Sequence, residues 1–144
     1  MTNHVHRLAT PKLADDLSKM MQPLGRMYVR YFNQQYKRIA TLREGWFKSL
    51  IVKKENYLLR CYRYIELNPV RAHMVSDPVE YKWSSYQCNA LGKQSDLLTP
   101  YEEHLTLSKS VDERQKIYQD LFKYQLDKEL VTKTCGTVTP LSRE

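Results

Sequence analysis

Hydrophobic residues recur at steps of three and four along most of the chain, which is typical of amphipathic helices. A first helix is predicted to begin at Thr10-Pro11, where a threonine N-cap precedes proline at the first helical position. Pro23 should kink or interrupt this helix. Its apolar side is expected to face inward, and it comprises Leu13, Leu17, Met20, Met21, Leu24, Tyr28, Tyr31 and Phe32.

A second helix is predicted over residues 55–67. Asn68-Pro69 should end it or bend it sharply, because proline restricts the residue before it and lacks a backbone N–H. Glu66 is close enough in sequence to Tyr64 and Asn68 to support them, but as a solvated residue of this helix it needs no special role. The core stripe of the helix comprises Leu58, Cys61, Tyr62 and Ile65.

The C-terminal part of the chain predicts two further helices. A short one is expected over residues 81–91, with Gly92 closing it, and the polar stretch 93–100 then resembles a linker. Residues 110–113 have the spacing of a capping box and open a last helix. Its apolar residues are Ile117, Tyr118, Leu121 and Phe122. Residues 132–144 show no period and are expected to form a loose tail.

Two segments favour strands over helices. Residues 4–10 alternate like a short strand, and residues 41–52 resemble a loop followed by a second strand. Two strands alone make a marginal sheet. The pattern therefore predicts helices together with two strands, and these strands require further strands to form a sheet.

The composition is that of an ordinary globular chain of 144 residues, with 42% hydrophobic and 27% charged residues. No apolar run approaches the roughly 20 residues that cross a bilayer, and no signal peptide is apparent. Cys61, Cys88 and Cys135 are odd in number and far apart, which argues against a disulfide framework and a CxxC metal site. We therefore expect a reducing cytoplasmic location and no membrane partner.

Charge divides the chain into two unequal halves. Residues 1–75 carry 14 Lys and Arg against 5 Asp and Glu, a net charge of +9, whereas residues 76–144 carry 9 against 11. A basic half indicates either a face that binds nucleic acid or a solvated basic surface, and charge alone favours neither. Several of the 11 tyrosines stand beside these cations. Such rings stack bases in some proteins, although tyrosine at helical spacing also fills cores.

Two pairs of residues are candidates for chemistry. His4 and His6 would share one face of a strand, within reach of a single metal ion, but a His-x-His pair near the start of a chain is also compatible with chance. Tyr64 and Asn68 share a helix face beside the core stripe. They could supply a nucleophile and a metal ligand. Alternatively, Tyr64 packs at the helix edge and Asn68 caps the helix.

Together these segments resemble a known enzyme family. Residues 1–6 are similar to the His-hydrophobic-His strand of HUH nucleases, and residues 64–72, YIELNPVRA, are similar to the tyrosine-bearing helix of the REP-associated tyrosine transposases. Residues 42–49, 57–59 and 81–86 also resemble segments of that family. The resemblance extends over most of the chain, to about Phe122.

The resemblance implies a specific chemistry. His4, His6 and Asn68 would hold Mg²⁺ or Mn²⁺, and Tyr64 would attack a phosphodiester of single-stranded DNA to give a 5′-phosphotyrosine link and a free 3′-hydroxyl. The partners implied are palindromic hairpins of single-stranded DNA near the bacterial nucleoid, with a homo-oligomer as an open possibility. The DNA-binding residues would be Arg26, Arg30, Lys37, Arg38, Lys48, Lys53, Lys54, Arg60 and Arg63.

The resemblance also implies a fold. This is a ferredoxin-like or RRM-like α+β sheet with helices packed on one side, whose first strand–helix–strand would precede the His-x-His motif and is expected to be missing. Residues 1–92 would form the catalytic core, 93–131 a helical C-terminal extension and 132–144 the tail. Two alternatives to an active transposase remain open. They are a catalytically inactive DNA-binding remnant and a subunit whose sheet is completed by another chain.

Overall fold

The computed structural model describes residues 5–39, 49, 51–52 and 55–124. The chain divides into two compact units. One unit takes its described residues from 9–49, and the other from 1–8 and 50–138. No helix within the described ranges has both the length and the apolar character needed to traverse a lipid bilayer.

The first unit contains a single long helix, α1 (Asp16–Tyr36). It begins later than the Thr10-Pro11 signal predicts, because a turn precedes it in which the Leu13 N–H donates to the Asp16 carboxylate over 2.9 Å. Helix α1 continues through Pro23, so the predicted interruption does not occur. Lys37 ends the helix in the left-handed region, with a φ of 49°.

The apolar side of α1 is not buried, contrary to the sequence-based expectation. Its ring contacts run along the helix itself, from Phe32 to Tyr28 at 6.1 Å and to Tyr36 at 4.4 Å between centroids. Contacts of this kind join residues one turn apart on one helix. A helical pattern specifies which side of a helix is apolar, but it does not supply the element that covers that side.

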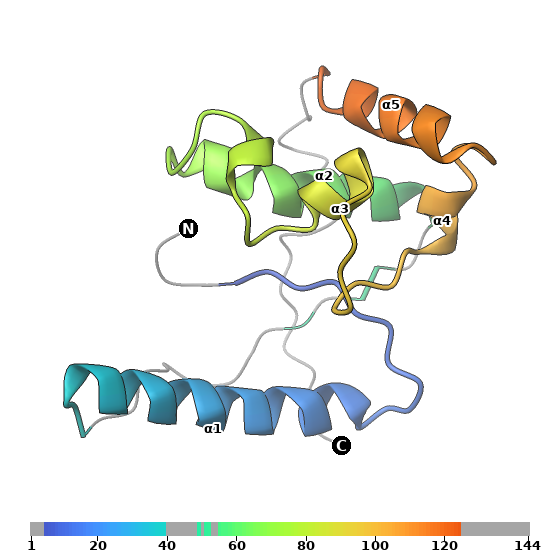
Figure 1. The fold of residues 1–144 in the computed structure, drawn as a ribbon. Helices are drawn as coiled ribbons and strands as arrows, with labels where there is room; N and C mark the ends of the chain where they lie inside the picture. The colour runs from blue at the N-terminus through green and yellow to red at the C-terminus, as the bar shows by residue number, and fades with distance from the viewer. Residues whose placement is uncertain (1–4, 40–48, 50, 53–54, 125–144) are drawn as a thin grey trace. The chain divides into compact units, whose positions relative to one another are not determined.

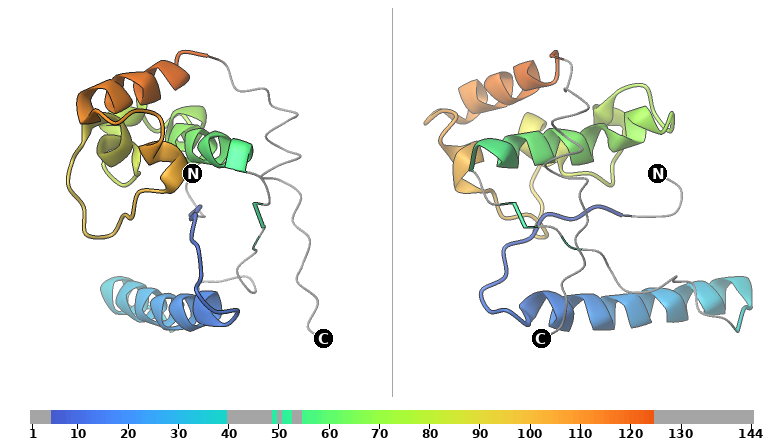
Figure 2. Two further views of the ribbon diagram at one scale, coloured as in Figure 1. Left: turned by 90° about the vertical axis from the view of Figure 1, so that its right-hand side faces the viewer. Right: turned by 180° about the vertical axis from the view of Figure 1, so that it is seen from behind.

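The second unit is a small helical assembly, shown in Figure 1 and from two further sides in Figure 2. Its elements are α2 (Glu55–Arg71), the 3₁₀ turn η1 (Pro78–Glu80), α3 (Tyr86–Leu91), α4 (Glu102–Leu105) and α5 (Val111–Leu121). Within it α2 packs against η1 and α4, while α3 packs against η1 and α5.

Helix α2 continues through Pro69 to Arg71, so the predicted end at Asn68-Pro69 is wrong. Proline removes one N–H from the helical ladder, and here the loss falls in the last turn, where few further hydrogen bonds depend on it. The ladder resumes at once: the Ala72 N–H donates to the Asn68 carbonyl over 2.9 Å. The helix is terminated instead by His73, whose φ is 53°.

The hydrophobic core of this unit lies where α3 meets α5. Tyr86, Ala90 and Tyr118 are buried there, with Leu59, Leu107, Leu121 and Phe122 packed around them. Gly92 closes α3 as the sequence predicts, whereas the helix starts at Tyr86 and not at Tyr81. Helix α5 begins after Ser110 as predicted, but without the side-chain cap, because Glu113 accepts a hydrogen bond from Ser108 over 2.6 Å.

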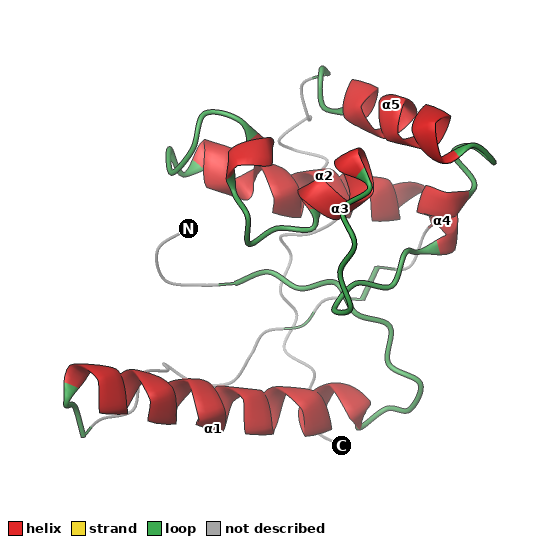
Figure 3. Cartoon of the chain, viewed as in Figure 1, coloured by secondary structure: helices red, strands yellow, loops and turns green. Residues whose placement is uncertain are grey.

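The expected ferredoxin-like α+β fold is not present, since no strand occurs in the ranges that the structure describes (Figure 3). Residues 5–10 of the first predicted strand have no regular secondary structure, nor do residues 49 and 51–52 of the second. The rest of the second segment up to residue 48, together with His4 and Leu50, lies outside the described residues. A strand is stable only where neighbouring strands pair with its backbone, and short alternation alone cannot provide them.

Replacing Gly92 by alanine is expected to lower the free energy of unfolding by about 1 kcal/mol, because φ at this position is +70°. The added Cβ would also meet the side-chain amide of Gln115, which is flexible and can move aside. Urea denaturation in a wild-type and in a Gln115→Ala background separates the two effects. If Gly92→Ala no longer lowers the free energy of unfolding in the Gln115→Ala background, the contact with the Gln115 side chain, and not the backbone conformation, causes the loss.

Candidate functional site

The ring of Tyr64 is contacted from two directions. His6, from the segment before α1, approaches it edge-on, with 5.4 Å between ring centroids and 72° between the planes. The guanidinium of Arg71, on α2 itself, lies 5.2 Å from the same ring centroid. Tyr64 and His6 are both partly exposed. The fold therefore brings one histidine of the His-x-His pair to the predicted nucleophile.

Asn68 lies one helical turn after Tyr64 and is 9% exposed. Its Nδ2 is buried and has no hydrogen-bond partner among the residues that the structure describes. A buried amide nitrogen without a partner costs about 1–3 kcal/mol. A half-turn of the amide would place Oδ1, a metal-ligand atom, at the same position. The expectation that Asn68 merely caps the helix does not fit, since α2 continues to Arg71.

Of the three predicted metal ligands, the structure describes His6 and Asn68. The His6 ring packs against Tyr64, and the buried Asn68 Nδ2 has no hydrogen-bond partner among the described residues. Imidazole and side-chain amide groups are ordinary ligands of divalent ions, so the chemistry of these two residues is compatible with a metal ion. His4 lies outside the described residues. Within the described ranges, no group of three His, Cys, Asp or Glu side chains has metal-binding spacing.

Glu66, which the sequence suggested would be solvated, is completely buried. Its Oε1 accepts hydrogen bonds from Ser85 Oγ over 2.5 Å and from Asn89 Nδ2 over 2.8 Å. Its Oε2 accepts one from the Tyr118 hydroxyl over 2.8 Å. The three donors come from the start of α3, from α3 itself and from α5. The carboxylate of Glu66 thus links α2 to both α3 and α5, whereas the core cluster around Tyr86 and Tyr118 lies between α3 and α5.

The position of Glu66 was visible in the sequence. It follows Tyr62 by four residues and Leu58 by eight, so it continues the core stripe of α2. Its charge favoured the solvated interpretation, because glutamate is rarely fully buried unless it is paired. The donors that pair with it lie 19, 23 and 52 residues away in sequence, and nothing local identifies them.

Burial determines the protonation of this cluster. Desolvation raises the pKa of Glu66 to about 7, although its three hydrogen bonds oppose the shift. Desolvation, followed by the charge of Glu66, also raises the pKa of Tyr118, which therefore remains a donor. His104 is buried beside Tyr118, with 5.1 Å between ring centroids, and desolvation lowers its pKa. The His104 Nε2–H donates to the backbone carbonyl of Asn89 over 3.1 Å.

The predicted DNA-binding cations fall into three groups. Arg26 and Arg30 on α1, and Lys37 and Arg38 after it, are exposed and belong to the first unit. Arg60 and Arg63 lie on α2 in the second unit. The remainder lie outside the described residues; they are Lys48, Lys53 and Lys54.

Arg63 has a structural role. Its guanidinium donates to the backbone carbonyl of Tyr124 over 2.5 Å and lies 5.8 Å from the ring centroid of Phe122. Desolvation, together with the nearby charges of Arg71 and Arg60, lowers its pKa. This arginine therefore ties α2 to the end of α5, and its predicted contact with DNA would require that tie to be shared or broken.

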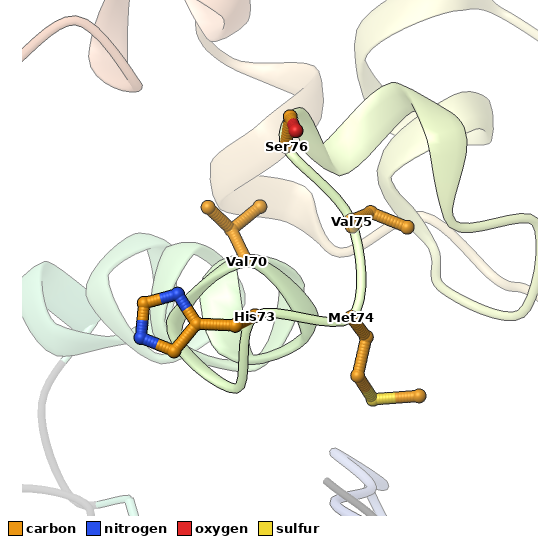
Figure 4. Close-up of a pocket in the computed structure, with 5 residues that line it drawn as sticks. All are labelled: Val70, His73, Met74, Val75 and Ser76. Atoms are coloured by element: carbon orange, nitrogen blue, oxygen red, sulfur yellow. The ribbon is translucent and has the colours of Figure 1, made fainter.

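A pocket of about 420 Å³ lies at the end of α2 and is lined by Val70, His73, Met74, Val75 and Ser76. Figure 4 shows the side chains of His73 and Met74 directed away from each other, and no convergent set of polar groups. The pocket therefore adds no chemistry to the site around Tyr64.

No protein-family model matches the chain, and no curated protein or solved structure matches it significantly.

Glu66→Gln is expected to remove a pH dependence of stability. The folded protein binds a proton at Glu66 up to a pKa of about 7, against 4.5 for the free side chain, so the wild type loses stability as pH rises from 4.5 to 7. The loss amounts to about 3 kcal/mol. His104 acts in the opposite sense below pH 6.5, equally in both proteins. Urea denaturation at several pH values between 4.5 and 7 measures the free energy of unfolding of both proteins. If it changes with pH equally in the wild type and in Glu66→Gln, Glu66 is not the group responsible.

Proposed function

We propose that the protein cleaves and rejoins single-stranded hairpin DNA through Tyr64, as a transposase of the HUH type. The observation that carries the proposal is the edge-on contact between His6 and Tyr64 at 5.4 Å, because two segments 58 residues apart in sequence, each resembling half of one catalytic site, meet in space. The buried Nδ2 of Asn68, one turn away, supports it, since no described residue accepts a hydrogen bond from it.

The anchoring of α2 also supports the proposal. Glu66 lies about 200° around the helix from Tyr64 and from Asn68. Its three hydrogen bonds fix the rotation of α2 about its axis. Tyr64 is thereby held on the side of α2 away from α3 and α5, where its hydroxyl can meet a substrate.

The reaction is a transesterification that conserves the number of phosphodiester bonds. A Tyr64 Oη–phosphorus bond forms while the bond from phosphorus to the 3′ oxygen breaks. The tyrosine proton passes, in the net reaction, to the departing 3′ oxygen. Attack of a 3′-hydroxyl on the phosphotyrosine reverses these changes and joins the strands, so no nucleotide cofactor is consumed.

His6 and Asn68, with His4, would hold a Mg²⁺ or Mn²⁺ ion. When bound, such an ion supplies Lewis-acid polarisation of the phosphodiester. The packing of His6 against Tyr64 orients the tyrosine ring, and the exposed cations of α1 and α2 attract the DNA backbone in a salt-dependent manner.

Incubation with labelled hairpin DNA and Mn²⁺ is expected to give a covalent protein–DNA band on a denaturing gel, which Tyr64→Phe abolishes. Tyr124→Phe removes an exposed hydroxyl of the same unit and should leave the band in place. Folded protein that binds the hairpin without forming a band would contradict the catalytic proposal. That result would favour the inactive DNA-binding remnant.

Asn68→Leu is expected to raise the free energy of unfolding by about 1 kcal/mol while abolishing Mn²⁺-dependent cleavage. The reason is that leucine replaces an amide whose buried nitrogen has no partner. Asn89→Leu is the matched control, since Asn89 is 7% exposed against 9% for Asn68 but donates to Glu66. This variant should lower the free energy of unfolding by about 2 kcal/mol or more.

Urea denaturation in the presence of EDTA measures both stabilities, and calorimetric titration with Mn²⁺ measures the metal affinity. A loss of stability in Asn68→Leu as large as that in Asn89→Leu would assign Asn68 a structural role.

A further inference from the structure

Arg71 reaches Tyr64 from two turns further along α2. Seven residues correspond to a rise of roughly 10.5 Å and to nearly the same side of the helix. Side chains on a helix lean toward its N-terminus, so the long arginine side chain spans most of that distance and lies back over the tyrosine ring. The guanidinium carbon stands 5.2 Å from the ring centroid.

The guanidinium N–H groups of Arg71 are engaged differently from those of the neighbouring arginines on α2. The Arg63 guanidinium donates to the Tyr124 carbonyl, and the Arg60 guanidinium lies 5.4 Å from the ring centroid of Tyr57. Arg71 is exposed, and among the described residues no hydrogen bond or ion pair engages its guanidinium. Its N–H groups therefore face solvent directly beside Tyr64.

The local charge reinforces this arrangement. Arg60 and Arg71 both act on Arg63, whose pKa falls through desolvation first and through these two charges in addition. Three cations thus share one stretch of α2. Glu66, a carboxylate on the same helix, does not neutralise them, because it is buried and accepts hydrogen bonds from α3 and α5.

We infer that Arg71 binds the nonbridging oxygens of the phosphate that Tyr64 attacks, and that it holds the tyrosine ring in line with that phosphate. The inference rests on the proposed function and assigns a residue to its reacting group. A planar guanidinium binds two phosphate oxygens at once, whereas lysine offers a single point of charge. Arg71 stays protonated throughout, and only the phosphorus–oxygen bonds change.

The test compares wild type, Arg71→Ala and Arg71→Lys at saturating hairpin DNA and Mn²⁺, so that the rate of adduct formation in the bound complex is measured. Arg71→Ala should lower this rate roughly 100-fold and Arg71→Lys about tenfold, because donors aimed at a reacting oxyanion act mainly in the transition state. Lys82→Ala is the control, since it removes another exposed cation that lies over an aromatic ring, 4.8 Å from that of Trp83. Its rate should equal that of the wild type.

A hairpin with a neutral methylphosphonate at the cleavage position supplies the second readout. The methylphosphonate keeps one neutral phosphoryl oxygen, so Arg71 loses its charged, two-oxygen contact. The wild type and Arg71→Ala should therefore form adduct at rates that differ much less than on ordinary DNA. A persistent 100-fold difference on this substrate would assign Arg71 to folding or general DNA attraction and overturn the inference.

The remaining outcomes separate the two proposals. Equal rates for wild type and Arg71→Ala on ordinary DNA overturn the role of Arg71 and leave the proposed function intact. Absence of adduct from the wild type overturns the proposed function, and the assignment of Arg71 with it.

Discussion

The carboxylate of Glu66 occupies the centre of a helical unit whose apolar core is small. Three helices meet at this side chain because Ser85, Asn89 and Tyr118 all donate to it. Such a cluster is stable only when every member is satisfied, since an unpaired polar group in this setting costs more than an apolar one. The orientation of α3 and α5 relative to α2 therefore depends on these three hydrogen bonds as much as on the contacts of Tyr86 and Ala90.

This constraint also determines what α2 presents to solvent. With Glu66 fixed on one side, Tyr64 lies on the other, between His6 and Arg71. The same helix thus has a side that holds the unit together and a side that carries the residues of the proposed site. A small rotation of α2 about its axis would break the hydrogen bonds to Glu66 and at the same time displace Tyr64. The stability of the unit and the geometry of the proposed site are therefore coupled.

The cations of α2 divide in the same way. Arg63 is turned toward α5 and serves packing, whereas Arg71 keeps its donors in solvent beside the tyrosine. Counting positive charges in the sequence does not distinguish these two uses. The environment of each guanidinium does, because a half-buried cation that already donates to a carbonyl has less capacity for a phosphate than an exposed one.

The sequence by itself determined the local features: the helical stretches of α1, α2 and α5, the glycine that closes α3, and the core positions Leu58, Cys61 and Tyr62. These follow from periodicity and turn chemistry, which act over a few residues. The tertiary structure decided the burial of Glu66, the meeting of His6 with Tyr64 and the absence of a sheet from the described residues. Those features depend on partners that are distant in sequence, and for such partners a local pattern carries no information.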